Sequence, residues 1–407
     1  MLPTSYYDKR RADYAVDFIQ NNLYHTAGKW LGQPFKLLNW QETIIRDIFG
    51  IINEDGFRQF RTAYVEIGKK NGKSELASAI ALYLLFADKE PAAEVYSCAA
   101  DTNQASIVFR GAMRMLELCP NLHKLSKLVP SQKTIHFPLF NSFYKVLSSE
   151  TKAKQGFNVS GLIFDELFAQ KDRELYDTMT KYTGDARQQP LYFLITTAGR
   201  DRNSLCYEVH QKAKAVLEGT KIDPAFYPAV YGMEDGDDWR DEKVWWRVNP
   251  SLGVTVEYKD VHAAYLQALE SHAEEMHFRQ FRLNEWTNAD VRWMPMDKWD
   301  NCAEDFDFSD FEGRDCYAGL DLSKTQDLTA LVLVFPPTDD DPKYTIIQNG
   351  FMCPNDVRKL EDLNPIENPA GDKFYFNGNM LPIELAGRQY VDEEEFKQEM
   401  EGDANEK

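Results

Sequence analysis

The sequence predicts an α/β protein whose first part has a mainly parallel central sheet and flanking helices. Three apolar segments predict buried strands, at residues 62–67, 161–165 and 190–196. Helical patterns lie between them, and residues 75–86 are apolar on nearly every face, as in a buried helix. Strands that alternate with helices form parallel sheets, which bind their ligands at the carboxyl ends of the strands.

Length and composition narrow the class of protein further. A chain of 407 residues with 43% hydrophobic residues predicts two or three domains with substantial cores. The sequence has neither a run of 18 apolar residues nor a secretory leader, so we expect a soluble, intracellular protein with no membrane partner. The six cysteines lack C-x-x-C spacing, which favours reduced core thiols over disulfides or a zinc site.

The net charge of −19 is concentrated at one end of the chain. Residues 301–407 hold 25 acidic and 9 basic side chains, a net charge of −16, which leaves −3 for residues 1–300. A nearly neutral body can still carry a basic patch that faces DNA. The overall charge therefore neither supports nor excludes a nucleic-acid partner.

The turn after the first strand carries residues suited to binding a nucleoside triphosphate. Residues 68–74 read Gly-Lys-Lys-Asn-Gly-Lys-Ser and open a helix, whose N–H groups and dipole favour phosphate. We expect Lys73 to reach the β- and γ-phosphates, and the Ser74 hydroxyl to bind Mg²⁺. The predicted ATP-binding segment also contains Lys69, Lys70, Asn71 and Gly72. Because the usual P-loop spacing would place a glycine at Ile67, a polar turn that starts a core helix is the alternative interpretation.

A pair of acids ends the strand at residues 161–165. Asp165 and Glu166 follow Gly-Leu-Ile-Phe, and Asp165 comes 92 residues after Lys73. In P-loop ATPases the first such acid holds the Mg²⁺ shell, and the second can accept a proton from the attacking water. We therefore predict that Asp165 is a metal ligand and that Glu166 is catalytic. A helix cap next to a solvated charge is the alternative.

Three more residues are candidates for the same site. The next strand ends in Thr196 and Thr197, which we expect near the γ-phosphate, where either hydroxyl could sense hydrolysis. Gln41 lies upstream of the phosphate loop and could read adenine through a paired donor and acceptor. A solvated helix residue is the alternative interpretation of Gln41.

We expect three regions along the chain. Residues 1–230 would form the ATPase domain with its N-terminal helices. Residues 231–312 would form a helical subdomain and linker, anchored by three tryptophans: Trp239, Trp245 and Trp246. Residues 313–407 would form a partial α/β nuclease domain of the RNase-H-like type, ending in an acidic tail.

The nuclease prediction is based on residues 317–335, which read as strand, turn and strong strand. RNase-H-like nucleases begin with an Asp on the first strand that bridges two divalent metals, beside an antiparallel partner. Asp321 has this position, and Asp327 lies in the turn. A strand-edge carboxylate is the alternative, because two-metal chemistry also needs acids from later strands.

Taken in order, these motifs resemble the large terminase subunit of tailed bacteriophages, the ATP-driven motor that packages DNA into procapsids. The matching segments are residues 40–41, 69–74, 162–166, 195–199, 319–323 and 327–331. The resemblance extends over residues 30–335, and Gly68 in place of a glycine at position 67 fits the altered phosphate loop of this family.

The resemblance implies a DNA-dependent ATPase joined to an RNase-H-like endonuclease that cuts concatemeric DNA. It implies ATP and Mg²⁺ as cofactors, with Mg²⁺ or Mn²⁺ for the nuclease. The implied partners are double-stranded DNA, a small terminase subunit and a portal protein, with a homo-oligomeric ring during packaging. The implied location is the cytoplasm of a phage-infected or lysogenic bacterial host.

Two departures from the family pattern modify this expectation. The family often has Arg where this chain has Lys69, which keeps the charge but loses bidentate phosphate geometry. Family members also continue well beyond this length, and the later acidic motifs of the family's nuclease have no convincing counterpart after residue 350. We therefore expect an intact ATPase with a truncated nuclease domain, in which Asp321 is at best part of a metal site. The alternatives are a helicase-like DNA-dependent ATPase and a non-catalytic assembly protein with a decayed phosphate loop.

Overall fold

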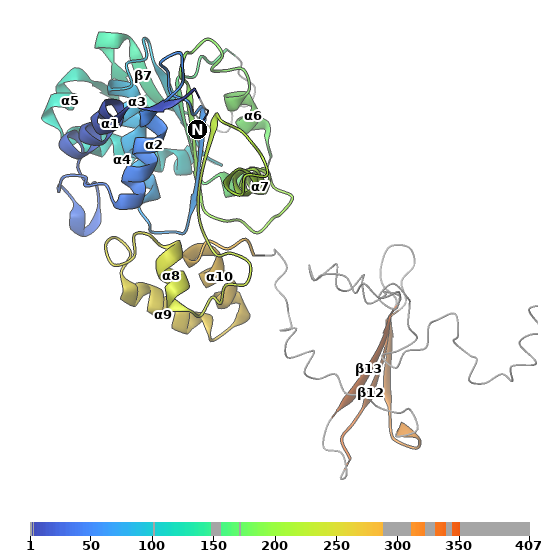
Figure 1. The fold of residues 1–407 in the computed structure, drawn as a ribbon. Coiled ribbons are helices and arrows are strands. Elements are labelled where there is room, and N and C mark those ends of the chain that lie inside the picture. Colours follow the sequence, from blue (N-terminus) through green and yellow to red (C-terminus); the bar gives the residue numbers. More distant parts are fainter. Residues whose placement is uncertain are drawn as a thin grey trace, which may run out of the picture. The chain divides into compact units, whose positions relative to one another are not determined.

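The computed structural model describes residues 2, 4–100, 102–147, 156–170, 172–287, 311–321, 330–338 and 344–350. The chain divides into two units, Met1–Trp293 and Met294–Lys407. The first unit contains a large sheet with helices on both faces, and a small group of helices (Figure 1). The second unit contains a three-stranded sheet.

The large sheet has eight strands in the order β10-β3-β9-β8-β4-β7-β6-β5. Its strands are β3 (Thr62–Ile67), β4 (Glu94–Cys98), β5 (Lys127–Val129), β6 (Thr134–Phe137), β7 (Ser142–Val146), β8 (Gly161–Asp165), β9 (Leu191–Thr196) and β10 (Phe226–Tyr231). Every pairing from β10 to β7 is parallel, and β6 and β5 are added antiparallel. The predicted mainly parallel sheet is confirmed.

Helices cover both faces of this sheet. One face packs against α1 (Lys9–Asn22), α2 (Asn39–Gly50), α3 (Lys73–Phe86), α4 (Thr102–Glu117) and α5 (Pro120–Leu125). The other face packs against α6 (Glu174–Thr180) and α7 (Leu205–Leu217). Short elements complete the unit: β1 (Tyr6–Tyr7), β2 (Ile51–Ile52), and the 3-10 turns η1 (Gly28–Trp30), η2 (Pro130–Gln132), η3 (Pro138–Phe140) and η5 (Leu167–Ala169).

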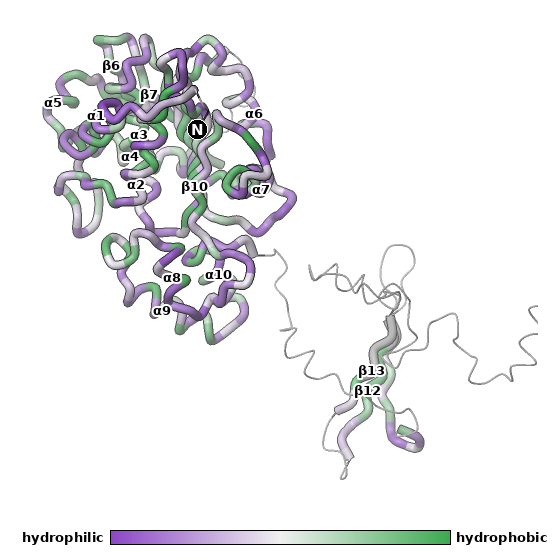
Figure 2. Tube along the Cα trace, in the orientation of Figure 1, coloured by the Kyte–Doolittle hydropathy of each residue, from purple (hydrophilic) through white to green (hydrophobic). Residues whose placement is uncertain are grey.

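Helix α3 is the centre of the larger core. Its side chains from Leu76 to Leu85 are buried around the whole circumference, as its continuous apolar sequence predicts. Full burial of one such Leu or Ile side chain contributes about 1.5–3 kcal/mol to folding. Figure 2 shows hydrophilic segments mostly on the outside of this unit and hydrophobic segments between the helices and the sheet. The helix that follows the phosphate loop is therefore a rigid base for that loop.

The region predicted as a helical subdomain contains three helices within the first unit: α8 (Glu242–Val248), α9 (Tyr258–Ala268) and α10 (His272–Arg282). These helices are called the helical subdomain below. Trp239 and Trp245 are buried in its core with Phe278, whereas Trp246 is 51% exposed. The predicted anchoring role of Trp246 is therefore wrong. Trp245 and Trp246 point about 100° apart on the helix, and Trp246 lies on the side that is outside the subdomain core.

The second unit has strands β11 (Tyr317–Asp321), β12 (Ala330–Phe335) and β13 (Thr345–Gly350), paired antiparallel in this order. Phe311 and Phe335 are buried against each other, with ring centroids 4.6 Å apart. The predicted strand and its antiparallel partner strand are confirmed, and the turn between them, residues 322–329, lies outside the described residues. Asp321 ends β11 opposite Ala330, while Asp327 and the acidic tail lie outside the described residues.

The cysteines and the apolar helices of the described residues can be compared with the expectations from composition. Cys98, Cys119 and Cys206 are free and buried, as expected of core thiols, whereas the free Cys316 is exposed. Among the residues that the structure describes, no helix has the length and apolar character needed to cross a membrane.

Candidate functional site

The strands that carry the predicted site residues are direct neighbours. Strand β9 lies between β3 and β8, and all three run parallel. Glu66 of β3 pairs with Thr196, and Asp165 of β8 pairs with Ile195. Their carboxyl ends therefore lie at one edge of the sheet, where the phosphate loop, the threonines and the acidic pair meet.

The phosphate loop turns sharply between β3 and α3. Lys70 and Gly72 both have left-handed backbone conformations, with φ of 74° and 90°. Gly72 is the residue before the first turn of α3, so the free N–H groups of that turn are presented at the loop. The left-handed conformation at position 72 favours glycine, because glycine has no Cβ to clash with the backbone.

Lys73 points back into the loop rather than into solvent. It is 6% exposed, and its Nζ donates to the carbonyl oxygen of Ile67 at 2.8 Å and to Oγ1 of Thr197. Nζ lies 4.0 Å from Oε1 of Glu166. Burial lowers the pKa of Lys73, and the carboxylates of Glu166 and Asp165 oppose that change. The ammonium group thus joins all three strand ends.

Asp165 lies in an environment that disfavours its charge. It is 2% exposed, and burial, followed by the neighbouring Glu166 charge, raises its pKa to about 7, while Lys73 acts in the opposite direction. Buried Oδ1 of Asp165 and Oε2 of Glu166 have no hydrogen-bond partner among the described residues. Buried carboxylate oxygens that lack partners fit the oxygen ligands preferred by Mg²⁺.

Glu166 leaves the strand in a strained conformation. Its φ of 51° is left-handed, and its N–H donates to the carbonyl oxygen of Ile195 at 2.9 Å. Such strain is tolerated where the surrounding structure holds the residue, and it concentrates at functional sites. The backbone turn places the Glu166 carboxylate on the same side as Lys73.

The two threonines differ in what their hydroxyls do, although both are fully buried. Oγ1 of Thr196 accepts from the N–H of Phe168 at 3.0 Å and donates to the carbonyl oxygen of Thr197 at 3.0 Å. Oγ1 of Thr197 instead accepts from Lys73. Of the two candidates, Thr197 is the one in contact with the phosphate-loop lysine.

Gln41 lies beside the phosphate loop although it precedes that loop by a helix and a strand. It is 3% exposed, and its Oε1 accepts from the N–H of Leu38 at 3.0 Å. Its Nε2 lies so close to Gly72 that a Cβ there would be 3.4 Å away. The interpretation of Gln41 as a solvated helix residue is therefore wrong, and adenine recognition remains a prediction.

Two of the remaining loop residues, Asn71 and Lys69, contact the helical subdomain. Asn71 is fully buried, and its Nδ2 donates to Asn249 Oδ1 at 2.9 Å, while its own Oδ1 accepts from the N–H of Ser251 at 3.3 Å. Nζ of Lys69 lies 3.7 Å from the ring centroid of Phe281. Lys70 is exposed, and Ser74, where α3 starts, is partly buried.

The subdomain also explains the displaced glycine of the loop. A Cβ on Gly68 would lie 2.9 Å from the carbonyl oxygen of Arg282, because the end of α10 packs directly on the loop. The N–H of Lys69 donates to the carbonyl oxygen of Phe281 at 2.7 Å. No local pattern in the sequence predicts these contacts, because they link the loop to residues up to 178 positions away, as from Asn71 to Asn249.

The predicted nuclease site is not tested by the structure. The described residues contain no group of three or more His, Cys, Asp or Glu side chains placed to hold a metal ion. Asp321 has a described backbone only, and Asp327 is outside the described residues. Metal binding by Asp321 stays a prediction.

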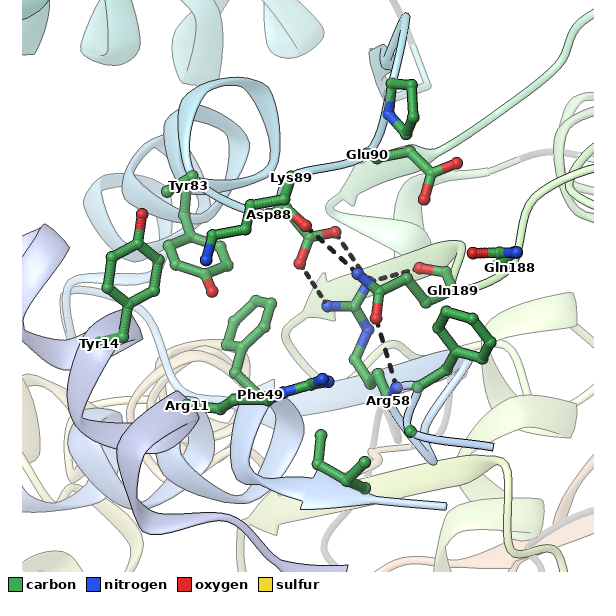
Figure 3. Close-up of a pocket in the computed structure, with 15 residues that line it drawn as sticks. Arg11, Tyr14, Phe49, Arg58, Tyr83, Asp88, Lys89, Glu90, Gln188 and Gln189 are labelled. Atoms are coloured by element: carbon green, nitrogen blue, oxygen red, sulfur yellow. Dashed lines mark hydrogen bonds and ion pairs between the residues drawn. The ribbon is translucent and has the colours of Figure 1, made fainter. Parts of the chain in front are cut away.

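A separate cavity of about 280 Å³ lies at the opposite edge of the sheet (Figure 3). Its lining includes Arg58, Asp88 and Gln189, which precede the parallel strands β3, β4 and β9. Arg58 donates to both carboxylate oxygens of Asp88, at 2.9 and 3.1 Å, and both residues are buried. None of the predicted site residues lines this cavity. The buried ion pair there joins segments at the beginning of the strands.

The fold and the first site together define the class of protein. A parallel sheet in which a Gly-Lys-Ser loop faces an acidic pair across one intervening strand is the arrangement of a P-loop NTPase domain.

Comparison with known proteins identifies the family. Residues 39–215 match the family model of the terminase large subunit, ATPase domain, and residues 221–364 match that of the terminase large subunit, endonuclease domain. The chain belongs to the terminase large subunit family. The second match begins before β10, a strand of the large sheet, so its start is not a structural boundary.

Individual relatives agree with this assignment. The terminase large subunit of Enterobacteria phage HK97 is 29% identical over 327 residues, which are 79% of this chain and 62% of that protein. The terminase large subunit of Lactococcus phage p2 is 24% identical over 80% of this chain and 60% of that protein. The crystal structure of the HK97 bacteriophage large terminase is similar, with a TM-score of 0.59 and 26% identity over 86% of this chain and 71% of that one. The chain therefore spans about three fifths of the length of these curated relatives.

Proposed function

We propose that this chain is an ATP-driven motor that translocates double-stranded viral DNA into a procapsid. The observation that carries the proposal is the contact of Lys73 with Thr197 and its 4.0 Å distance to Glu166, at the ends of three adjacent parallel strands. The family membership supports the same activity. Its partners would be DNA, a small terminase subunit and a portal protein, with several copies of the chain forming a ring.

In this proposal each side chain has one task during ATP hydrolysis. The Lys73 ammonium would exchange its carbonyl and Thr197 partners for the β- and γ-phosphate oxygens. An anionic ligand beside this buried amine would favour its charged form, which burial alone disfavours. Glu166 would orient the attacking water and accept its proton. The free backbone N–H groups at the start of α3 would donate hydrogen bonds to the phosphate oxygens.

The acidic pair and Ser74 fit a magnesium ion bound with ATP. Asp165 presents a buried oxygen without a partner, and Ser74 would add its hydroxyl from the start of α3. Bound Mg²⁺ would neutralise the charge that develops on the phosphates. Gln41, next to Gly72, would contact the adenine.

The endonuclease activity belongs to the same proposal. The match to the endonuclease family model and the antiparallel pair β11 and β12 support it. Asp321 would be a ligand of the Mg²⁺ or Mn²⁺ ions that the nuclease uses to cleave DNA. The cleavage activity would be reduced if the chain lacks further acidic ligands for these ions.

Hydrolysis of Mg²⁺-ATP by the purified chain, with and without blunt duplex DNA, tests the motor. We expect DNA to stimulate hydrolysis, and Lys73→Ala to abolish it while the circular dichroism spectrum stays unchanged. Lys145→Ala, which removes an exposed lysine on β7, is the matched control. Unchanged hydrolysis in Lys73→Ala would refute the site, and absence of hydrolysis in the wild type would favour the assembly protein. Translocation on tailed single strands but not on blunt duplex would favour a helicase-like enzyme.

A further inference from the structure

Ala198, the residue after Thr197, is held at both of its backbone polar groups by side chains from outside the sheet. Asn284 Oδ1 accepts from the N–H of Ala198 at 2.7 Å. Gln280 Nε2 donates to the carbonyl oxygen of Ala198 at 3.0 Å. Asn284 and Gln280 are 2% and 3% exposed, so neither bond competes with bulk water.

Asn284 also reaches the neighbouring strand ends, and Gln280 holds a second residue after β9. Nδ2 of Asn284 donates to the carbonyl oxygen of Tyr231, at the end of β10, at 2.8 Å and to Glu66 Oε1, on β3, at 3.3 Å. Oε1 of Gln280 accepts from Nε of Arg200 at 2.8 Å. One Asn amide therefore joins the ends of β9, β3 and β10, which are adjacent in the sheet.

The backbone of Asn284 suits this task. Its φ of 55° is left-handed, a conformation in which Asn is several-fold enriched among residues other than Gly. It lies two residues after the end of α10. The turn that ends α10 thus directs the Asn284 amide toward the strand ends.

We propose that Asn284 and Gln280 are positioning residues for ATP hydrolysis, which fix the Ala198 peptide so that the Thr197 hydroxyl stays against Lys73. This inference rests on the proposed function. Thr197 and Ala198 share a peptide bond, so a shift of the Ala198 peptide moves the hydroxyl that accepts from Lys73. A displacement of about 1 Å in a catalytic arrangement can cost about 10²-fold in rate.

Two substitutions of Asn284 separate its backbone role from its amide role. Asn284→Gly keeps the left-handed conformation and removes every side-chain bond. Asn284→Asp keeps the acceptor for Ala198 but loses the donor and puts a second carboxylate beside Glu66. Protonation of that carboxyl at lower pH restores a donor, so the kcat of Asn284→Asp relative to the wild type should rise as pH falls.

Other titratable and charged groups face the same place in both proteins. Glu66 accepts from Tyr64 on its own strand, and its Oε2 lies 2.9 Å from Nδ1 of His210 on α7. Sγ of Cys206, also on α7, lies 3.8 Å from the Tyr64 hydroxyl. Arg200 reaches the cluster through Gln280. The ratio of variant to wild-type kcat at each pH removes the pH dependence that both proteins share, and the added carboxyl beside Glu66 belongs to the variant alone.

The test is steady-state ATP hydrolysis by the full chain, with fluorescent-nucleotide titration to count folded sites. We expect Asn284→Gly and Gln280→Met to lower kcat per folded site by about tenfold or more, with KM for ATP within about threefold of the wild type. A merely structural role would reduce the number of folded sites and leave kcat per site unchanged. Asn141→Asp, a left-handed and exposed Asn at the end of η3, is the control and should keep wild-type kcat.

The outcomes separate this inference from the proposed function. Wild-type kcat per site in both Asn284→Gly and Gln280→Met overturns the inference, while loss of hydrolysis in Lys73→Ala still supports the motor. If Asn284→Gly does not fold, Gln280→Met, which breaks the other bond to Ala198, decides by the same criterion. A wild-type chain that hydrolyses no ATP overturns both.

Discussion

Asp165→Asn should stabilise the nucleotide-free protein, and more so at high pH. Burial and the Glu166 charge raise the pKa of Asp165 from 3.8 to about 7 in the folded protein. Between these two values the folded state binds more protons than the unfolded state, so the free energy of unfolding falls as pH rises. Above pH 8 the wild type would have lost about 4 kcal/mol, at about 1.36 kcal/mol per pKa unit. The amide cannot ionise and avoids this loss.

The measurable quantity is the difference between variant and wild-type free energies of unfolding. From the same two pKa values, this difference should increase by about 2.5 kcal/mol between pH 5 and pH 8. Any cost of placing an amide at this position that does not depend on pH cancels between the two conditions. Urea unfolding followed by tryptophan fluorescence measures both proteins at each pH.

Asp17→Asn, which removes an exposed carboxylate from α1, is the matched control for the change of side chain. If the difference in free energy of unfolding between Asp165→Asn and the wild type is equal at pH 5 and pH 8, the pKa of Asp165 is not raised in the folded protein. A variant that is less stable than the wild type at pH 8, yet not at pH 5, would reverse the sign and refute the reasoning.

Two further predictions concern the acidic pair and the opposite edge of the sheet. Glu166→Gln should bind Mg²⁺-ATP with near wild-type affinity but hydrolyse it at least about 10²-fold more slowly, because the amide cannot accept a proton from water; loss of nucleotide binding would instead indicate a structural role. Arg58→Met should lower the free energy of unfolding by about 3 kcal/mol, because it leaves Asp88 buried without its bidentate partner. Urea unfolding measures that change, and the double variant Arg58→Met/Asp88→Leu should recover part of it; a single variant as stable as the wild type would contradict the prediction.

The sequence by itself determined which residues could act together. Alternation of apolar strands and helices predicts parallel strands, and parallel strands bring Lys73, Thr197 and Glu166 to one edge whatever the details of packing. That inference needed only local patterns, since each motif is confined to a few consecutive residues. It is confirmed by the order β3-β9-β8.

Only the tertiary structure decided how each of these residues is held. Thr196 and Thr197 are equivalent in sequence, and the distinction between them comes from Phe168 and Lys73, which contact one hydroxyl each. The raised pKa of Asp165 depends on complete burial, which no motif specifies. Gln41 was expected from its order in the chain, and its place beside Gly72 depends on how α2 packs.

The helical subdomain shows the same division. Its helices could be predicted, yet Asn249, Gln280 and Asn284 reach the phosphate loop and the strand ends only in the folded chain. Hydrogen bonds between residues far apart in sequence depend on the relative placement of two packed elements, to within fractions of an ångström. Local propensity cannot encode that placement, because it results from the packing of the whole first unit.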